Sequence, residues 1–251
     1  MYNFFVDGSG RHNNGYIITG TDYNHIKNVL RMNEGDTLLV SENGKSNLCE
    51  IEKLENECVF VNIIEENFNN TNLPVKIYLF QGLPKGDKME LIIQKAVELG
   101  AEGIIPVEMN RCVVRLDDKK KKNKVIRWQS IAESAAKQSK RTVIPKVYDV
   151  MNCKQALEKA SELSLLLVPY ENKNGMKATK ETLSGIKSGD SVGILVGPEG
   201  GFEDFEIEAA INAGGKTVSL GKRILRTETA AITAMAMCML HVEMNINGED
   251  E

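Results

Sequence analysis

The chain has 251 residues, 42% of them hydrophobic, and a formal net charge of -4, which suits one large globular domain or two smaller ones with buried cores. Residues 1–7 form no basic and apolar leader, and no apolar run reaches about 18 residues, so we expect no export, no membrane span and a cytoplasmic location. The five cysteines are scattered singly, away from the three histidines, which disfavours a disulfide framework and predicts no metal site.

Basic residues are concentrated in one part of the chain, between Arg111 and Lys146. This segment holds twelve basic and three acidic residues, a charge of +9, so the remainder carries -13. Such asymmetry predicts an anionic partner, such as nucleic acid, for one face of the protein. For the lysine run 119–122, a solvated loop is the alternative.

Short, β-branched or alternating segments separated by Gly, Asn and Asp turns predict strands in the first part of the chain. We expect these strands at residues 2–6, 16–19, 36–41, 48–54 and 58–64. One helix is predicted from Thr21 or Asp22 to Gly35, with either residue as its N-cap. Five short strands with one helix are typical of a small closed β-barrel.

A polar, asparagine-rich stretch that ends at Pro74 predicts a linker over residues 68–74, between domains at 1–67 and 75–251. Beyond it, apolar runs alternate with helical periodicity. We expect strands at 77–80, 103–107, 143–147, 163–168, 191–196 and 217–220, and helices at 87–99, 122–139, 153–161, 179–186, 203–213 and 227–243. This alternation predicts an α/β domain whose mainly parallel sheet is covered on both faces.

In open α/β sheets, ligands bind beyond the carboxyl ends of strands. The strongest candidate loop is 197–202, which reads Gly-Pro-Glu-Gly-Gly-Phe and leads from an apolar strand into a helix. Its three glycines allow a ligand to approach the backbone, and amides at a helix start bind electronegative groups. A glycine turn required only by local sterics is the alternative. Neither a G-x-G-x-x-G fingerprint nor a P-loop is present, which disfavours NAD and ATP.

A second candidate loop, residues 220–229, leaves a short strand and enters the last helix. Thr227 and Glu228 read as an ordinary helix start, but Arg223 and Arg226 oppose the helix dipole and need a local reason. An anionic substrate is such a reason.

The two loops together, 195–202 and 220–230, resemble the RsmE family, the small-subunit ribosomal RNA uridine-N3 methyltransferases of the SPOUT superfamily. Residues 25–32 are similar to the family's PUA-like barrel signature, and 86–100 to its first catalytic-domain helix; Arg111 is similar to the basic turn that follows. The chain departs from the family where it has Lys137 and Lys140, because the family usually has glutamate and glycine there.

The resemblance implies a PUA-like N-terminal barrel and a SPOUT domain with a C-terminal trefoil knot, an exception to the rule against threaded chains. It implies a homodimer that transfers a methyl group from S-adenosylmethionine to N3 of a decoding-centre uridine in 16S ribosomal RNA of the small ribosomal subunit, without a metal. The residues that the resemblance places around the cofactor are Leu167, Val168, Pro169, Gly197, Glu199, Gly200, Gly201, Leu220, Ile224, Leu225 and Thr227.

Methylation at N3 requires removal of a weakly acidic proton, which a base or a nearby cation can assist. We predict Arg226 as the cation and Glu228 as a candidate base; a pairing of Glu228 with Arg226 or Arg223 at the helix start is the alternative. We expect RNA contacts from Arg31, Arg111, Arg115, Gln138, Lys140, Arg141 and Arg223. Two other functions stay open: a noncatalytic RNA-binding or ribosome-assembly factor on the same fold, and a SPOUT methyltransferase that acts on another RNA.

Overall fold

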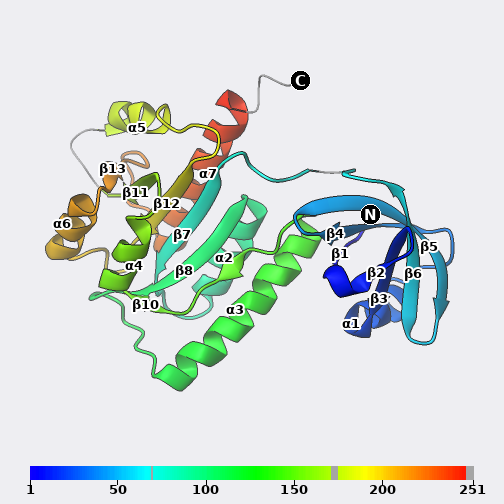
Figure 1. Ribbon diagram of the computed structural model, residues 1–251. Helices are drawn as coiled ribbons and strands as arrows, with labels where there is room; N and C mark the ends of the chain where they lie inside the picture. The colour runs from blue at the N-terminus through cyan, green and yellow to red at the C-terminus, as the bar shows by residue number, and fades with distance from the viewer. Residues whose placement is uncertain (69, 171–174, 247–251) are drawn as a thin grey trace. The chain divides into compact units, whose positions relative to one another are not determined.

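The computed structural model describes residues 1–68, 70–170 and 175–246. The chain divides into two compact units (Figure 1). The first unit comprises Met1–Asn72 and Ala136–Ile144, and the second comprises Leu73–Ala135 and Pro145–Glu251. The chain passes between units at the end of the expected linker, but the first unit also takes in Ala136–Ile144, which the sequence pattern assigns to the second domain.

The first unit is built on one six-stranded sheet in the order β1-β4-β5-β6-β3-β2. Its strands are β1 (Asn3–Phe5), β2 (Arg11–His12), β3 (Gly15–Thr19), β4 (Thr37–Glu42), β5 (Lys45–Glu55) and β6 (Cys58–Glu65). The pair β1 and β4 is parallel and the other pairs are antiparallel. Alternate side chains point into a core formed around Phe4, Tyr16, Ile26, Leu38 and Val61.

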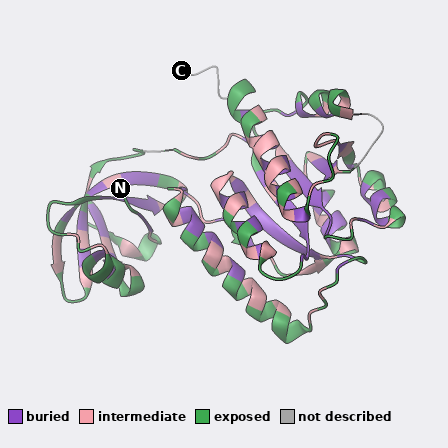
Figure 2. Ribbon diagram, turned by 180° about the vertical axis from the view of Figure 1, so that it is seen from behind, coloured by how far each residue is buried: buried purple, intermediate pink, exposed green. Residues whose placement is uncertain are grey.

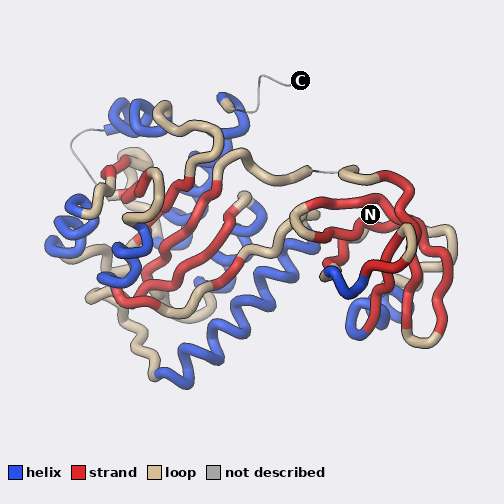
Figure 3. Tube along the Cα trace, in the orientation of Figure 1, coloured by secondary structure: helices blue, strands red, loops and turns tan. Residues whose placement is uncertain are grey.

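The predicted closed barrel is only partly correct, since β1 and β2, the two edge strands of the sheet, share no ladder in the described part of the chain. Strand β2 has only two residues, both exposed, and pairs with β3 alone, so the sheet does not close against β1. The unit is therefore a half-barrel, and its sheet is drawn in red in Figure 3.

The helical segment of this unit is shorter than predicted. It consists of α1 (Gly20–Asn24) and the π-helical turn η2 (His25–Val29), and it ends before Gly35 because Arg31 takes a left-handed φ of 54°. The backbone N–H of Met32 donates to the carbonyl of Ile26 at 3.1 Å, which closes the helix end in the manner of a Schellman turn. A short 3-10 turn, η1 (Gly8–Gly10), precedes β2.

The second unit contains a parallel sheet in the order β10-β8-β7-β12-β11-β13, with β9 also paired to β8. Its strands are β7 (Lys76–Gly82), β8 (Ala101–Glu108), β9 (Lys146–Val147), β10 (Met151–Asn152), β11 (Leu165–Pro169), β12 (Ser191–Val196) and β13 (Lys216–Val218). Strands β7 and β12 are buried almost throughout, as the apolar runs predict (Figure 2). The mainly parallel α/β sheet is confirmed, while the trefoil knot stays a prediction.

Helices cover both faces of this sheet. They are α2 (Lys88–Glu98), α3 (Asp118–Gln138), α4 (Cys153–Ala160), α5 (Gly175–Leu183), α6 (Asp204–Asn212) and α7 (Thr227–Asn245). Helices α2 and α7 pack against each other and against the central strands, while α4 lies on β8 and β10 and contacts α6 (Figure 1). All these strands are parallel, so the loops after β7, β8, β11, β12 and β13 emerge at one edge of the sheet.

The lysine run 119–122 is the first turn of α3 and not a loop. Helix α3 begins at Asp118, and the Asp117 side chain accepts from the backbone N–H of Lys120 at 2.8 Å, which caps the helix. Lysine has a high helix propensity, so the helix with its capped lysine run begins four residues before the predicted start. Within the described residues, no helix is long and apolar enough to cross a membrane.

Candidate cofactor cleft and active site

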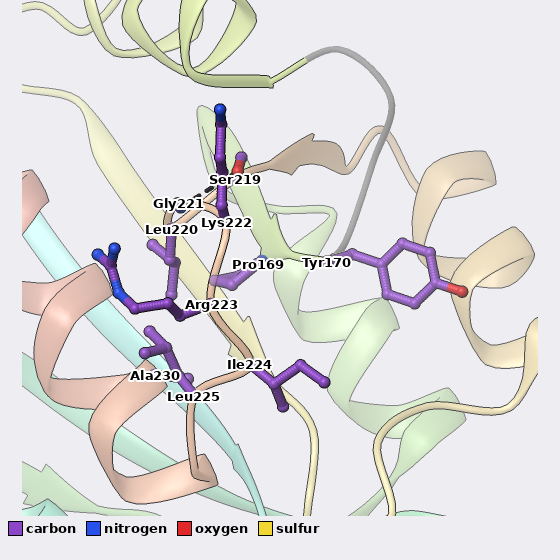
Figure 4. Close-up of a pocket in the computed structure, with 10 residues that line it drawn as sticks. All are labelled: Pro169, Tyr170, Ser219, Leu220, Gly221, Lys222, Arg223, Ile224, Leu225 and Ala230. Atoms are coloured by element: carbon purple, nitrogen blue, oxygen red, sulfur yellow. Dashed lines mark hydrogen bonds between the residues drawn. The ribbon is translucent and has the colours of Figure 1, made fainter.

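Two adjoining cavities open at the carboxyl edge of the sheet in the second unit. The larger, of about 590 Å³, lies between the glycine-rich loop and residues 224–227; the smaller, of about 200 Å³, lies along residues 219–225. Both are bordered by Pro169 and Tyr170 at the end of β11 and by Ala230 in α7. Figure 4 shows Leu220, Leu225 and Ala230 on one side of the smaller cavity and Tyr170 on the other. The two predicted loops therefore form the walls of one cleft.

Hydrogen bonds fix the glycine-rich loop from several sides. The Lys85 backbone N–H donates to Glu199 Oε1 at 3.0 Å, and Arg111 Nη1 donates to the Gly200 carbonyl at 3.2 Å. Arg111 also pairs with Glu203, at 2.9 Å, where α6 begins. The pairing raises the pKa of Arg111 and lowers that of Glu203, chiefly through this hydrogen bond. The loop is thus held in one shape before any ligand binds.

Glycine is required at two positions by close packing of the backbone. A Cβ on Gly82 would lie 2.7 Å from the backbone nitrogen of Pro198, and a Cβ on Gly200 would lie 2.9 Å from Cβ of Arg111. Neither neighbour is the free end of a flexible side chain, so a larger residue would displace the loop. Local sterics therefore require glycine at position 200, and Gly200 also lines the larger cavity.

A buried hydrogen-bond chain joins the glycine-rich loop to the start of α7. The Thr227 hydroxyl donates to the Gly197 carbonyl at 2.7 Å and accepts from Gln81 Nε2 at 2.9 Å. Thr227 is 5% exposed and Gln81 is fully buried, so these bonds lie in a region of low dielectric. These hydrogen bonds connect the end of β7, the glycine-rich loop and Thr227, the residue that follows Arg226.

Lys88 forms an ion-pair cluster at the wall of the larger cavity. Its Nζ lies 3.0 Å from Glu199 Oε1 and 3.2 Å from Glu228 Oε2. Burial alone would raise the pKa of Glu199, but hydrogen bonds from the Lys85 backbone and from Lys88 lower it overall. Glu228 therefore pairs with Lys88, and not with Arg226 or Arg223 as the sequence alternative suggested.

The loop from Lys222 to Arg226 is held very differently. Its three cationic side chains, Lys222, Arg223 and Arg226, are exposed and form neither hydrogen bond nor ion pair with the part of the chain that the structure describes. Ile224 is 95% exposed although it borders both cavities. An apolar side chain and unpaired cations at a cleft mouth provide contacts for an anionic ligand with an apolar part.

Comparison with known proteins agrees with this geometry. Residues 71–239 match the model of an RNA methyltransferase domain, and residues 18–64 match that of an RNA methyltransferase PUA domain. The ribosomal RNA small subunit methyltransferase E of Bacillus subtilis is 42% identical over 233 residues, which are 91% of each chain. That of Mesomycoplasma hyopneumoniae is 35% identical over 95% of this chain and 99% of its own. The chain belongs to the ribosomal RNA small subunit methyltransferase E family.

Two solved structures are similar to most of this chain. A ribosomal RNA small subunit methyltransferase E from Neisseria gonorrhoeae, bound to S-adenosyl methionine, superposes with a TM-score of 0.80 at 31% identity and covers 96% of this chain and 97% of its own. A methyltransferase from Legionella pneumophila in complex with the same cofactor has a TM-score of 0.80 at 31% identity over 95% and 96% of the two chains. The RsmE resemblance and the PUA-like plus α/β fold class are confirmed.

Most residues predicted around the cofactor line the two cavities. The residues that do so are Pro169, Gly197, Glu199, Gly200, Gly201, Leu220, Ile224, Leu225 and Thr227. Leu167 and Val168 do not line either cavity: they are fully buried in β11, where they support the strand from within the core. Of the two predicted catalytic residues, Arg226 lines the larger cavity and Glu228 does not.

The predicted RNA-binding residues fall into three environments. Arg223 lies at the cleft, Arg111 is engaged with the glycine-rich loop, and Arg115 donates to the carbonyl of Asn110 at 2.9 Å in the same turn. The others belong to the first unit: Arg31, Gln138 and Lys140 are exposed, whereas Arg141 is only 4% exposed. For Arg141, contact with RNA would therefore require its side chain to move.

Both departures from the family pattern have a local explanation in the first unit. Lys137 Nζ pairs with Asp22 at 2.6 Å and lies 5.9 Å from the centre of the Phe4 ring, so its charge is used inside this unit. Lys140 has a left-handed φ of 56°, the conformation that glycine adopts most easily. The glycine usual in the family thus fits a backbone constraint that Lys140 tolerates.

Several cleft residues were missed by sequence reasoning. Lys88 and Tyr170 line the larger cavity but were not predicted as site residues. The sequence analysis placed Lys88 only in a helix, and Tyr170 directly follows the predicted Pro169. Tyr170 packs edge-on against Phe202, with ring centres 6.4 Å apart. Tyr170 could have been found as the next residue beyond a strand end, but nothing in the local sequence around Lys88 indicates its partners.

Proposed function

We propose that this protein methylates N3 of a uridine in 16S ribosomal RNA of the small ribosomal subunit, with S-adenosylmethionine as the methyl donor. The observation that carries the proposal is the cleft itself, in which a rigid glycine-rich wall faces a loop with unpaired cations. The relatives named ribosomal RNA small subunit methyltransferase E support the substrate class, and the cofactor in the Neisseria gonorrhoeae structure supports the donor.

The residues of the cleft fit the proposed cofactor. A volume of about 590 Å³ in the larger cavity is in the range of small-molecule sites. Leu220, Leu225 and Ala230 supply apolar surface of the kind that an adenine ring needs, and Gly200 and Gly201 leave backbone accessible beside it. When bound, S-adenosylmethionine supplies an electrophilic methyl group. Among the described residues, no cluster could hold a metal ion.

Arg226 is proposed as the cation that stabilises the uracil as N3 loses its proton. It is exposed at the larger cavity, and Thr227 beside it is fixed by two buried hydrogen bonds, so its backbone is held while its side chain stays available. Uridine N3 lies on the base-pairing edge, so the base must be unpaired or extruded to react. Arg31, Arg111, Arg115, Gln138, Lys140, Arg141 and Arg223 remain proposed RNA contacts.

We further propose a cytoplasmic homodimer whose partner subunit covers part of α7. Leu240 and Met244 on this helix are 47% and 68% exposed, which favours burial against another protein surface. Analytical ultracentrifugation at micromolar concentration should give twice the mass of one chain; a single chain at all concentrations would refute the dimer.

The function is tested with small subunits from cells that lack the modification. Incubation with the purified protein and labelled S-adenosylmethionine, followed by nucleoside mass spectrometry, should yield N3-methyluridine in 16S RNA. Methyl transfer to another RNA or to a ribose hydroxyl would replace the substrate assignment. Cofactor binding without any transfer would favour a noncatalytic ribosome-assembly factor on the same fold.

A further inference from the structure

Lys88 is a cation of the cleft that holds a fixed position and has not yet been given a function. It is the first residue of α2 and lines the larger cavity, whereas Glu228 does not. Its ammonium is held by Glu199 of the glycine-rich loop and by Glu228 of α7. A charged group from one helix is therefore fixed at the cavity wall by carboxylates from two other segments.

The two carboxylates are themselves restrained. Glu199 Oε1 accepts from the Lys85 backbone N–H at 3.0 Å, and the Glu228 side chain is 15% exposed in the first turn of α7. Pairing with Glu199 chiefly, and with Glu228 to a lesser extent, raises the pKa of Lys88. The Lys88 ammonium is thus oriented by two carboxylates, whereas the Arg226 side chain is unpaired within the described residues.

At least one N–H of the Lys88 ammonium has no partner within the described residues. An ammonium has three N–H donors and no acceptor. Two carboxylates lie within pairing distance, and Lys88 has no further partner among the residues that the structure describes. A donor without a partner, on a side chain that lines a cavity, is available to a ligand there.

The charge of the cluster indicates what kind of ligand atom this donor suits. Lys88, Glu199 and Glu228 together carry a net charge of -1, which disfavours a phosphate at this point of the wall. A neutral carbonyl oxygen can accept the hydrogen bond without that repulsion. Uracil presents such an oxygen on each side of N3.

We propose that Lys88 is a further catalytic residue, which donates its remaining N–H to a uracil carbonyl oxygen next to N3. This inference rests on the proposed function. As the N3–H bond breaks, its proton passes to water and its electron pair stays on the base, partly on the oxygen that Lys88 contacts. That pair forms the bond from N3 to the methyl carbon, while the pair of the breaking carbon–sulfur bond goes to sulfur. Glu199 and Glu228 act as positioning residues for Lys88.

Lys95 provides a matched control on the same helix. It pairs with Glu98 at 2.8 Å and is about as exposed as Lys88, at 36% against 32%, but it does not line either cavity. K88M, K88R and K95M should be compared for kcat, for cofactor affinity by calorimetry without RNA, and for thermal stability.

We expect K88M to lower kcat about 100-fold, in the range for loss of one preorganised donor, with cofactor affinity and melting temperature close to those of K95M. K88R should retain kcat within about fivefold, because arginine also donates. If Lys88 assists ionisation of N3, the K88M defect shrinks at higher pH and with RNA that carries 5-fluorouridine, whose N3 is more acidic.

Three results would overturn the inference. The first is a K88M protein as active as K95M, and the second is a loss of kcat that is the same at every pH and with both bases. Loss of cofactor affinity in K88M as large as its loss of kcat would also overturn it, since Lys88 would then serve the cofactor. Failure of the wild-type protein to form N3-methyluridine would instead refute the proposed function, so the two failures are distinguishable.

Discussion

The two walls of the cleft are built in opposite ways. Hydrogen bonds from Lys85, Arg111 and Thr227 hold the glycine-rich loop, whereas the side chains from Lys222 to Arg226 make no contact of this kind within the described chain. A preformed wall suits a small cofactor that is the same in every turnover. A wall of exposed cations suits an RNA whose phosphates and extruded base arrive together. We therefore expect mutations in the glycine-rich loop to affect cofactor binding, and mutations of the exposed cations in the other wall to affect substrate activation.

The largest difference between the change in kcat and the change in cofactor affinity is expected at Arg226. Arg226→Ala removes the cation proposed to stabilise the uracil anion, so kcat should fall by about 100- to 1,000-fold. Cofactor affinity should stay within roughly tenfold, or about 1.4 kcal/mol. Single-turnover methyl transfer and calorimetry measure the two quantities, with Lys222→Ala as a control that changes transfer less. Equal losses of affinity and rate would place Arg226 in the cofactor wall and break the comparison.

The opposite pattern is expected in the glycine-rich loop. Gly200→Val places a branched side chain against Cβ of Arg111, 2.9 Å from the added Cβ, and displaces the loop. We expect cofactor affinity to fall at least about tenfold, as measured by calorimetry. Gly185→Ala is the matched control in this unit, because its nearest neighbour, a carbonyl oxygen, lies 3.4 Å away. Normal cofactor affinity in Gly200→Val would show that the loop shape does not matter for binding.

A smaller effect, on protein stability, is expected at Thr227, whose hydrogen bonds join the glycine-rich loop to the start of α7. Thr227→Val keeps the shape of the side chain but leaves the Gly197 carbonyl and Gln81 Nε2 without this partner. Buried groups that lose a partner cost about 1–3 kcal/mol each in stability, and chemical denaturation should show a loss in this range. Thr233→Val, at a half-buried position of the same helix, should change stability by less than about 0.5 kcal/mol. Equal effects of both variants would mean that this hydrogen-bond chain does not hold the loop.

The smallest effect is expected from pH. Hydrogen bonding to Arg111 lowers the pKa of Glu203 from 4.5 in the folded state. A lowered folded-state pKa stabilises the protein above the unfolded value, and this contribution is lost as pH falls through the folded value. The melting temperature should therefore decline below about pH 4.5, and less steeply in Glu203→Gln than in Glu208→Gln, a control in the same helix. Identical pH profiles for the two variants would show that the link from Arg111 to Glu203 adds no stability.

Local sequence pattern was sufficient for the parallel sheet and for both loops. The apolar runs at 77–80 and 191–196 predicted strands that the structure places side by side, and turn chemistry identified residues 197–202. It was insufficient where a feature depends on packing. The helix end at Arg31 depends on a left-handed residue that is not glycine, and the open half-barrel depends on an edge strand of two residues.

The Lys88 cluster shows why part of the site escaped prediction. Glu199 lies 111 residues beyond Lys88 in the chain, and Glu228 lies another 29 residues beyond Glu199. The three residues meet only because the segments after β7 and β12 and the start of α7 lie at the same end of the sheet. Leu167 and Val168 show the converse, because they belong to the right strand but point into its core. Strand ends can be located from sequence, whereas the side of the strand end that faces a ligand depends on the register of the sheet.

The most direct test of the two-wall account is a calorimetric titration of three proteins, the wild type, Gly200→Val and Arg226→Ala, with S-adenosylmethionine in the absence of RNA. We predict binding by the wild type, similar binding by Arg226→Ala, and binding that is at least about tenfold weaker in Gly200→Val. No binding by the wild type, or stronger dependence on Arg226 than on Gly200, would contradict it.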